Sequence, residues 1–269
     1  MHGLGNDFVL INGLNTTIEL GSEQIRFIAD RRLGIGCDQV LMIEASQSAE
    51  ADIRYRIFNA DGAEVEQCGN GVRCVGEYLR RHSLIEAETI RVATQGGLVT
   101  IHFEDENKIR VDMGIPSFEP EKIPLALTQR QERYRLTMAS GEFEVMALSM
   151  GNPHAVLLVK DIEQAEVLHI GAEIQGNTMF PESVNVGFME IIDERHIRLR
   201  VNERGVGETQ ACGTGACAAV AAGIIAGKLG RDVDVELHGG SLSISWAGEG
   251  QTLWMTGPAT NVYEGQIEI

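Results

Sequence analysis

The sequence ACGTGACAAVAAGIIAG, residues 211–227, contains no charged residue and consists mainly of Ala and Gly. It predicts a helix over residues 213–225 that is apolar on every side. The segment is slightly short for a membrane span and lacks the Leu and Phe typical of such spans. We therefore expect a helix that other elements of the same chain enclose.

A second segment of the chain has the same design. CGNG at residues 68–71 opens a predicted helix that ends in basic residues near His82, and CGTG at residues 212–215 opens the helix described above. A further cysteine, Cys74 or Cys217, follows each motif, and strand-rich sequence precedes each one. We interpret the chain as a loose duplication in which each half holds a helix inside a sheet.

Strand patterns dominate the rest of the sequence. Apolar and polar residues alternate with period two in some segments, and shorter apolar runs mark further strands. The alternating segments are 53–57, 197–201 and 242–246, and the shorter runs are 8–11, 40–43, 98–103 and 155–159. Turns with Gly, Asn or Asp separate many of them, which favours largely antiparallel sheets. A short helix is predicted to follow an N-cap at Ser22, with Ile25, Ile28 and Ala29 on one face.

These elements predict the α+β class, with two pseudo-symmetric domains that each wrap a mostly antiparallel sheet around a central helix. Pro116, Pro120 and Pro124 interrupt the pattern between the halves. The sequence thus predicts an N-terminal domain at residues 1–114 and a C-terminal domain at residues 115–257.

The charge and the cysteine content exclude several classes of protein. Asp and Glu number 39 against 22 Lys and Arg, which gives a net charge of −17. Phosphate backbones repel such a chain, so we expect no nucleic-acid partner. The five cysteines are an odd number, and the N-terminus lacks the pattern of a signal peptide. We therefore expect a cytoplasmic protein without membrane association.

The paired motifs place one cysteine at each predicted helix N-terminus. Backbone N–H groups and the helix dipole stabilise a thiolate there, and they can also bind a substrate carboxylate. If both helix ends face one cleft, Cys68 and Cys212 lie on opposite sides of one α-carbon. One sulfur removes a proton and the other supplies one to the opposite face. This inversion needs no cofactor, pyridoxal phosphate included.

The other cysteines are interpreted as small core residues: Cys37, Cys74 and Cys217. The local spacings, Cys-x5-Cys and Cys-x4-Cys, have no histidines in register. Such spacings disfavour a zinc site, so no metal is predicted.

Eight motifs in order along the chain resemble the diaminopimelate epimerase family. They are HGLGNDF (2–8), GCDQ (36–39), FNADG (58–62), EQCGNGVRC (66–74), GNPH (151–154), VNV (184–186), ERGVGET (203–209) and ACGTG (211–215). Family members usually carry a few residues of strand before the first motif, so we expect a shortened first strand here.

The resemblance implies interconversion of L,L- and meso-2,6-diaminopimelate, a step toward lysine and peptidoglycan. It implies Cys68 and Cys212 as the acid–base pair. It also implies a C-terminal strand, residues 258–269, that returns to the first domain. Backbone groups at the reacting carboxylate would come from Gly69, Asn70, Gly213 and Thr214.

The unreactive end of such a substrate needs partners for a carboxylate and an ammonium group. Arg204 offers a planar fork to the carboxylate. Glu203, Asn59 and Asn185 can accept hydrogen bonds from the ammonium group. Neutral hydrogen-bonding groups in the same pocket are Asn6, Gln39 and Asn152. The resemblance further implies that His154 and Glu203 modulate the cysteine pKa values and that Tyr263 contributes to a homodimer.

Two alternatives remain open at this point. A proline racemase-like enzyme would carry histidine in the first motif, where this chain has Asn70, and would need no clamp such as Arg204. A non-enzymatic thiol-based binding or redox protein would bind a ligand or switch a disulfide without turnover. Deuterium exchange at the α-position of diaminopimelate distinguishes these classes from the epimerase.

Overall fold

The computed structural model describes residues 1–65, 69–104 and 108–268. Its internal contacts divide the chain into a first unit, Met1–Asp112 with Thr256–Ile269, and a second unit, Met113–Met255. The sequence-based boundaries lie at residues 114/115 and 257/258. Strand β17 (Leu253–Gly257) crosses from the second unit to the first. The prediction of a C-terminal strand at residues 258–269 is wrong: residues 258–268 belong to the first unit but form no strand, and Thr260 makes an isolated bridge with His2.

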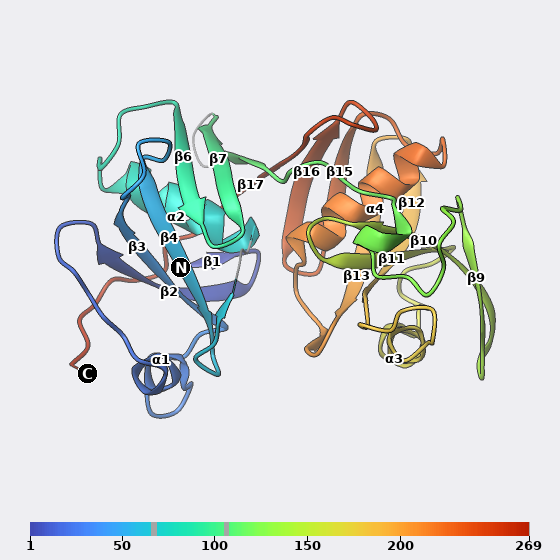
Figure 1. The fold of residues 1–269 in the computed structure, drawn as a ribbon, viewed down its shortest axis with the longest axis horizontal. Coiled ribbons are helices and arrows are strands. Elements are labelled where there is room, and N and C mark those ends of the chain that lie inside the picture. Colours follow the sequence, from blue (N-terminus) through green and yellow to red (C-terminus); the bar gives the residue numbers. More distant parts are fainter. Residues whose placement is uncertain (66–68, 105–107, 269) are drawn as a thin grey trace. The chain divides into compact units, whose positions relative to one another are not determined.

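The first unit wraps strands around the helix α2 (Gly69–Arg81), with a shorter helix, α1 (Ser22–Ala29), outside them (Figure 1). Its strands are β1 (His2–Gly3), β2 (Asn6–Gly13), β3 (Gln39–Ala45), β4 (Ile53–Asn59), β5 (Glu64–Val65), β6 (Thr89–Thr94), β7 (Gly97–Phe103) and β8 (Ile109–Asp112).

The second unit encloses the helix α4 (Gly213–Ile225) in the same manner. Its other helices are the 3-10 turn η1 (Pro120–Lys122) and α3 (Val167–Gln175). Its strands are β9 (Tyr134–Met138), β10 (Gly141–Ser149), β11 (Pro153–Val159), β12 (Asn185–Asp193), β13 (His196–Glu203), β14 (Gly207–Glu208), β15 (Asp232–Leu237) and β16 (Gly240–Trp246).

The two units repeat one strand order. In the first unit β2 pairs with β3 in parallel, β3 with β4 in antiparallel and β4 with β6 in parallel orientation. Strands β11, β12, β13 and β15 pair in the same sequence. Helix α1 connects β2 to β3 as α3 connects β11 to β12, and α2 precedes β6 as α4 precedes β15. The pseudo-symmetry predicted from the two cysteine motifs is confirmed at the level of topology.

Helix α4 is buried along most of its length, as its composition predicts. Residues from Gly215 to Gly223 are buried, and α4 packs against β10, β11, β12, β13 and β16. A β-carbon at Gly223 would lie 2.3 Å from the side chain of Leu229. A β-carbon at Gly215 would lie 3.0 Å from the side chain of Val201 in β13. Glycine at these two positions therefore leaves room for the neighbouring strand and for the segment that follows the helix. Of the helices within the described residues, none is long and apolar enough to cross a membrane.

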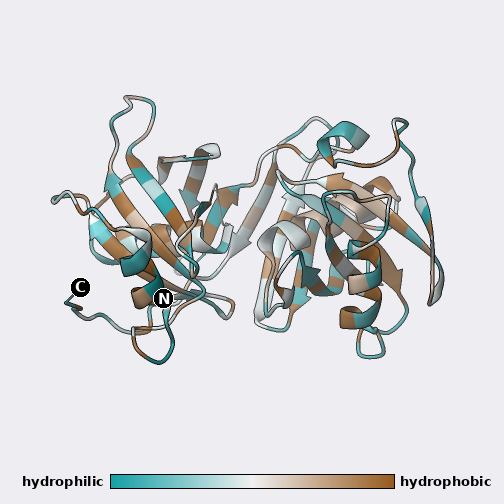
Figure 2. Cartoon of the chain, turned by 60° about the horizontal axis from the view of Figure 1, so that its bottom comes forward, coloured by the Kyte–Doolittle hydropathy of each residue, from teal (hydrophilic) through white to brown (hydrophobic). Residues whose placement is uncertain are grey.

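Strand β3 is buried on both faces, which explains its uninterrupted apolar run. Val40 and Met42 pack into a cluster with Ile25 and Ile28 of α1. Leu41, on the opposite face, lies next to Gly71 of α2. Other strands alternate hydrophobic and hydrophilic residues (Figure 2); in β15, for example, exposed and buried residues alternate.

Two local predictions need correction. Ser22 was predicted to be the N-cap of α1, but it is the first residue of the helix, and the N-cap is Gly21. The backbone N–H of Gly21 donates to Oε1 of Gln24 at 2.9 Å. The helix α3 was not predicted. Its N-cap, Glu166, forms no side-chain capping hydrogen bond, so its sequence carries no start signal.

Candidate active site

In the first unit, predicted site residues gather at one edge of the sheet. Asn6 begins β2, Gln39 begins β3 and Asn59 ends β4. The register aligns Gln39 with Asn59 and with Phe8, two residues after Asn6. Nε2 of Gln39 donates to Oδ1 of Asn59 at 2.8 Å. Helix α2 begins at the same edge, since Nδ2 of Asn70 donates to Oδ1 of Asn6 at 3.3 Å.

Gly69 and Asn70 form the first turn of α2, so their backbone N–H groups lie at the N-terminus of the helix. Asn70 is buried. Cys68, the predicted acid–base residue of this unit, lies outside the described residues. Its role therefore stays a prediction.

The second unit repeats this arrangement. His154 in β11 pairs with Asn185 at the start of β12, and Glu203 ends β13. Asn152 precedes β11, and its Nδ2 donates to Oγ1 of Thr214 in α4 at 3.3 Å. The sheet edge and the N-terminus of the central helix meet in this unit as well.

Cys212 is the N-cap of α4 and is only 4% exposed. Its Sγ lies 3.6 Å from Oγ1 of Thr214. Burial raises the pKa of the Cys212 thiol well above its usual value, and the nearby charge of Glu203 raises it further, against hydrogen bonds from Thr214 and the backbone of Gly215 that lower it. The hydrogen bonds at the helix terminus thus lower the pKa less than burial raises it, and Cys212 is a thiol at neutral pH.

His154 is a neutral imidazole. It is 1% exposed, and burial followed by the charge of Arg204 lowers its pKa to about 3. Its Nε2 lies 2.9 Å from Oδ1 of Asn152, which can only accept, so Nε2 carries the proton. Hydrogen bonds then lead from His154 through Asn152 and Thr214 to the sulfur of Cys212.

Asn185 holds the backbone that carries the predicted clamp. Its Nδ2 donates to the carbonyl of Pro153 at 3.2 Å, and its Oδ1 accepts the N–H of Arg204 at 2.9 Å. The guanidinium of Arg204 donates to the carbonyl of Glu182 at 2.9 Å. Asn185 therefore positions Arg204, in addition to the ammonium-binding role predicted for it.

Glu203 is oriented by a residue that the sequence reasoning did not select. Oγ1 of Thr209 donates to Oε1 of Glu203 at 2.5 Å. The preceding residue, Glu208, accepts two hydrogen bonds from Arg200 at 2.6 and 2.9 Å. These contacts stabilise the β13–β14 hairpin. The alternation of charged residues along β13 and β14 is the sequence feature from which they could have been predicted.

Other predicted residues lie apart from these groups. Tyr263 follows β17 in the first unit and is 62% exposed. Cys37, Cys74 and Cys217 are buried core residues. Within residues 1–65, 69–104 and 108–268, no group of three His, Cys, Asp or Glu side chains is arranged to hold a metal ion.

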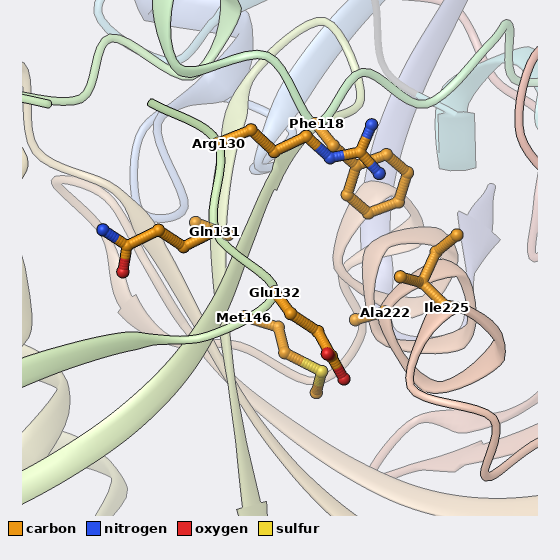
Figure 3. A pocket seen from close by; sticks show the side chains of 8 residues that line it. Phe118, Arg130, Gln131, Glu132, Met146, Ala222 and Ile225 are labelled. Carbon is orange, nitrogen blue, oxygen red and sulfur yellow. The ribbon is translucent and has the colours of Figure 1, made fainter. Parts of the chain in front are cut away.

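A cavity of about 420 Å³ lies in the second unit near the C-terminal end of α4, whereas Cys212 lies at its N-terminal end. Figure 3 shows the side chains that line it, with the guanidinium of Arg130 stacked over the ring of Phe118. None of the predicted site residues lines this cavity, and its arginine is paired with Glu249.

The chain is similar to proteins of known family. The family model for diaminopimelate epimerase matches residues 1–119 and 146–262. The diaminopimelate epimerase of Nitrosospira multiformis is 50% identical over 269 residues, which are 100% of this chain and 97% of the relative. That of Nitrosomonas europaea is 52% identical over 269 residues, with 100% and 98% covered.

Among solved structures, a probable proline racemase from Agrobacterium radiobacter is similar, with a TM-score of 0.70 at 17% identity. The similarity covers 100% of this chain and 91% of the racemase. It confirms the predicted fold class.

Proposed function

Because the chain belongs to the diaminopimelate epimerase family, we propose that it interconverts L,L- and meso-2,6-diaminopimelate. The observation that carries the mechanism is the state of Cys212, a buried thiol at the N-terminus of α4. A thiol at this place can deliver a proton to a carbon whose carboxylate binds the same helix terminus.

The proposed reaction moves one proton at each face of the α-carbon. The thiolate of Cys68 takes the α-proton and becomes a thiol, and the bonding electron pair stays on the α-carbon and its carboxylate. The thiol of Cys212 then gives its proton to the opposite face and becomes a thiolate. The reverse reaction exchanges the two roles, so no external oxidant, reductant or base is consumed.

Helix N-termini stabilise the charge that develops on the carboxylate in this step. The N–H groups of Gly69 and Asn70 at α2, and those of Gly213 and Thr214 at α4, are the donors we assign to it. Donors fixed before the reaction need no reorganisation as the charge forms, which makes this stabilisation effective. The proposal requires both helix termini to reach one substrate molecule.

The distal amino-acid head of the substrate decides specificity. We assign its carboxylate to Arg204 and its ammonium group to Glu203, Asn59 and Asn185, with Gln39 held beside Asn59. A site with these polar groups rejects a substrate that lacks the second head, because the groups are then left without partners. Proline is such a substrate.

Two further assignments belong to this proposal. We assign the protein to the cytoplasm, since its cysteine content does not match a secreted disulfide protein. We also propose a homodimer through the segment around Tyr263, because Val262 and Tyr263 are large apolar or aromatic side chains exposed side by side.

The test is deuterium exchange in D2O. We expect the protein to place deuterium at the α-position of L,L-diaminopimelate and to leave proline unlabelled. Cys68→Ala and Cys212→Ala should each abolish epimerisation. Cys217→Ala, in the helix that Cys212 caps, is the matched control and should retain it. Full epimerisation in either of the first two variants would contradict the two-thiol mechanism.

A second measurement tests the required proximity of the two sulfurs. Mild oxidation of the substrate-free protein should join Cys68 to Cys212, and peptide mass spectrometry detects the linkage. Oxidised, inactive protein in which both thiols remain separate would contradict the arrangement.

A further inference from the structure

Arg73 carries a positive charge into the interior of the first unit. It lies in the second turn of α2, and its side chain is 0% exposed. A buried charge is costly unless hydrogen bonds satisfy it. Nη2 of Arg73 donates to Oδ1 of Asn70 at 3.0 Å, and Nε donates to the carbonyl of Pro258 at 3.2 Å. The guanidinium therefore joins the first turn of α2 to the C-terminal segment.

The contact with Arg73 fixes the orientation of two amide groups. Because Oδ1 of Asn70 faces a donor, its Nδ2 faces Oδ1 of Asn6. Nδ2 of Asn6 in turn donates to Oδ2 of Asp38 at 2.9 Å. A guanidinium can only donate and a carboxylate can only accept, so the chain of hydrogen bonds has one direction. If the side-chain amide of Asn6 or Asn70 were rotated by 180°, it would lose the hydrogen bond of its oxygen and that of its nitrogen.

The carboxylate at the other end of this chain is also held in place. Nη2 of Arg31 donates to Oδ1 of Asp38 at 2.8 Å, and both terminal nitrogens of Arg31 donate to Asp7 at 2.7 Å. The backbone N–H of Asp7 donates to Oδ2 of Asp38 at 3.1 Å. Oδ2 therefore remains oriented toward the start of β2, where Asn6 lies.

The backbone around Arg73 is shaped to admit this arrangement. A β-carbon at Gly3 would lie 3.2 Å from Nη2 of Arg73 and 3.2 Å from the carbonyl oxygen of Asn70. These separations are tighter than ordinary contacts, so glycine leaves the room that the guanidinium occupies.

We infer that Arg73 is a positioning residue for substrate binding: with Asp38 at the other end, it fixes the amide groups of Asn70 and Asn6 in one orientation and so presets the donors and acceptors that meet the substrate. This inference rests on the proposed function, in which Asn70 belongs to the helix terminus that binds the substrate carboxylate, and on the sequence-based prediction that Asn6 lies in the same pocket. Arg73 itself acts through these two residues.

The first experiment measures kinetics of Arg73→Met, which keeps much of the side-chain volume and removes every donor. We expect KM for diaminopimelate to rise about tenfold, the equivalent of one hydrogen bond, while kcat changes less than about threefold, since the amides bind substrate and transition state alike. Arg81→Met, at the exposed end of the same helix, is the control and should keep the wild-type KM.

A double-mutant cycle separates positioning from a general structural effect. Asn6→Ala should raise KM by itself, and adding Arg73→Met should then change KM far less than in the wild type, because the amide that Arg73 orients has lost its partner. Effects that simply multiply would overturn the inference.

Asp38→Asn tests the same chain from its half-exposed end, and it keeps the proposal testable if Arg73→Met does not fold. Asp38 accepts from Asn6 with one carboxylate oxygen and from Arg31 with the other. An asparagine has only one acceptor oxygen in its side chain, so one of these two hydrogen bonds is lost. We expect a similar rise in KM. A wild-type KM in Asp38→Asn would overturn the inference.

A readout without turnover distinguishes this inference from the proposed function. The side-chain amide signals of Asn6 and Asn70 in ¹⁵N NMR should both shift in Arg73→Met and stay unchanged in Arg81→Met. If Arg73→Met shows these shifts but the wild-type protein exchanges no α-proton, the proposed function is refuted and the inferred orientation of the amides stands. Normal exchange together with unshifted signals and a wild-type KM would refute the inference alone.

Discussion

Lowering the pH should destabilise the second unit through one residue, His154. In the folded chain the pKa of this imidazole is about 3, whereas an unfolded chain has the ordinary value near 6.5. Between these two values the unfolded state binds a proton that the folded state does not bind. The free energy of unfolding therefore rises with pH in this window, and its contribution from His154 is lost as the pH falls from 6.5 toward 3.

The magnitude follows from the two pKa values. Each pH unit between them corresponds to about 1.4 kcal/mol. From pH 7 to pH 5 the chain passes through about one and a half units of the window, so His154 should account for about 2 kcal/mol of lost stability. Since marginal stability is about 5 to 15 kcal/mol, this loss is easily measured.

The assay is urea unfolding at pH 7 and pH 5, followed by tryptophan fluorescence. Both tryptophans, Trp246 and Trp254, lie in the second unit, so the signal reports on the unit that contains His154. His154→Gln removes the titration and keeps a donor for Asn152. The loss of stability between the two pH values should be about 2 kcal/mol smaller in this variant than in the wild type.

His169→Gln is the matched control, because His169 lies exposed on α3 of the same unit. Exposed pairs contribute little, so this variant should keep the wild-type pH dependence. Equal pH dependence in wild type and His154→Gln would refute the reasoning, since it would mean that the buried imidazole is protonated in the folded state at pH 5.

Three further predictions concern other parts of the chain. Gly34→Ala should destabilise the first unit by about 3 kcal/mol or more in thermal or urea unfolding, because its β-carbon would lie 1.7 Å from the carbonyl oxygen of Phe27; unchanged stability would refute the packing. Arg200→Met should cost about 2 kcal/mol and raise KM, because it removes two hydrogen bonds to the half-buried Glu208 that hold the β13–β14 hairpin; wild-type kinetics would contradict this. Cys37 should resist iodoacetamide at pH 8 in the folded protein and react in urea, as judged by peptide mass, because burial raises its pKa to about 11.

The helices and strands were predictable where local sequence determines them. The apolar composition of residues 213–225 requires a buried helix whatever surrounds it, and the structure has a helix with these bounds. The helix α3 was missed because it spans only nine residues and its N-cap contributes no side-chain hydrogen bond. Short helices of this kind form through packing against the rest of the unit, which a single segment of sequence does not encode.

The site was predictable as a set of polar residues but not as a set of contacts. The sequence selects Asn185 and Arg204, yet only the fold shows that the amide of Asn185 holds the backbone of Arg204. The protonation of Cys212 depends on burial and on Glu203, both of which are tertiary properties. Arg73 was not selected because one charged residue in a helix ordinarily faces solvent.

The division of the first unit into two chain segments has a consequence for synthesis on the ribosome. Residues 256–269 complete this unit: His2 and Thr260 exchange two backbone hydrogen bonds of 2.9 Å. Residues 113–255, by contrast, emerge as one continuous piece. Domains ordinarily fold in the order in which they leave the ribosome, N-terminal first. We expect the reverse order in this chain, because the first unit gains these contacts only after residues 256–269 have been synthesised. The amino-terminal strands are then the part that a chaperone would need to shield.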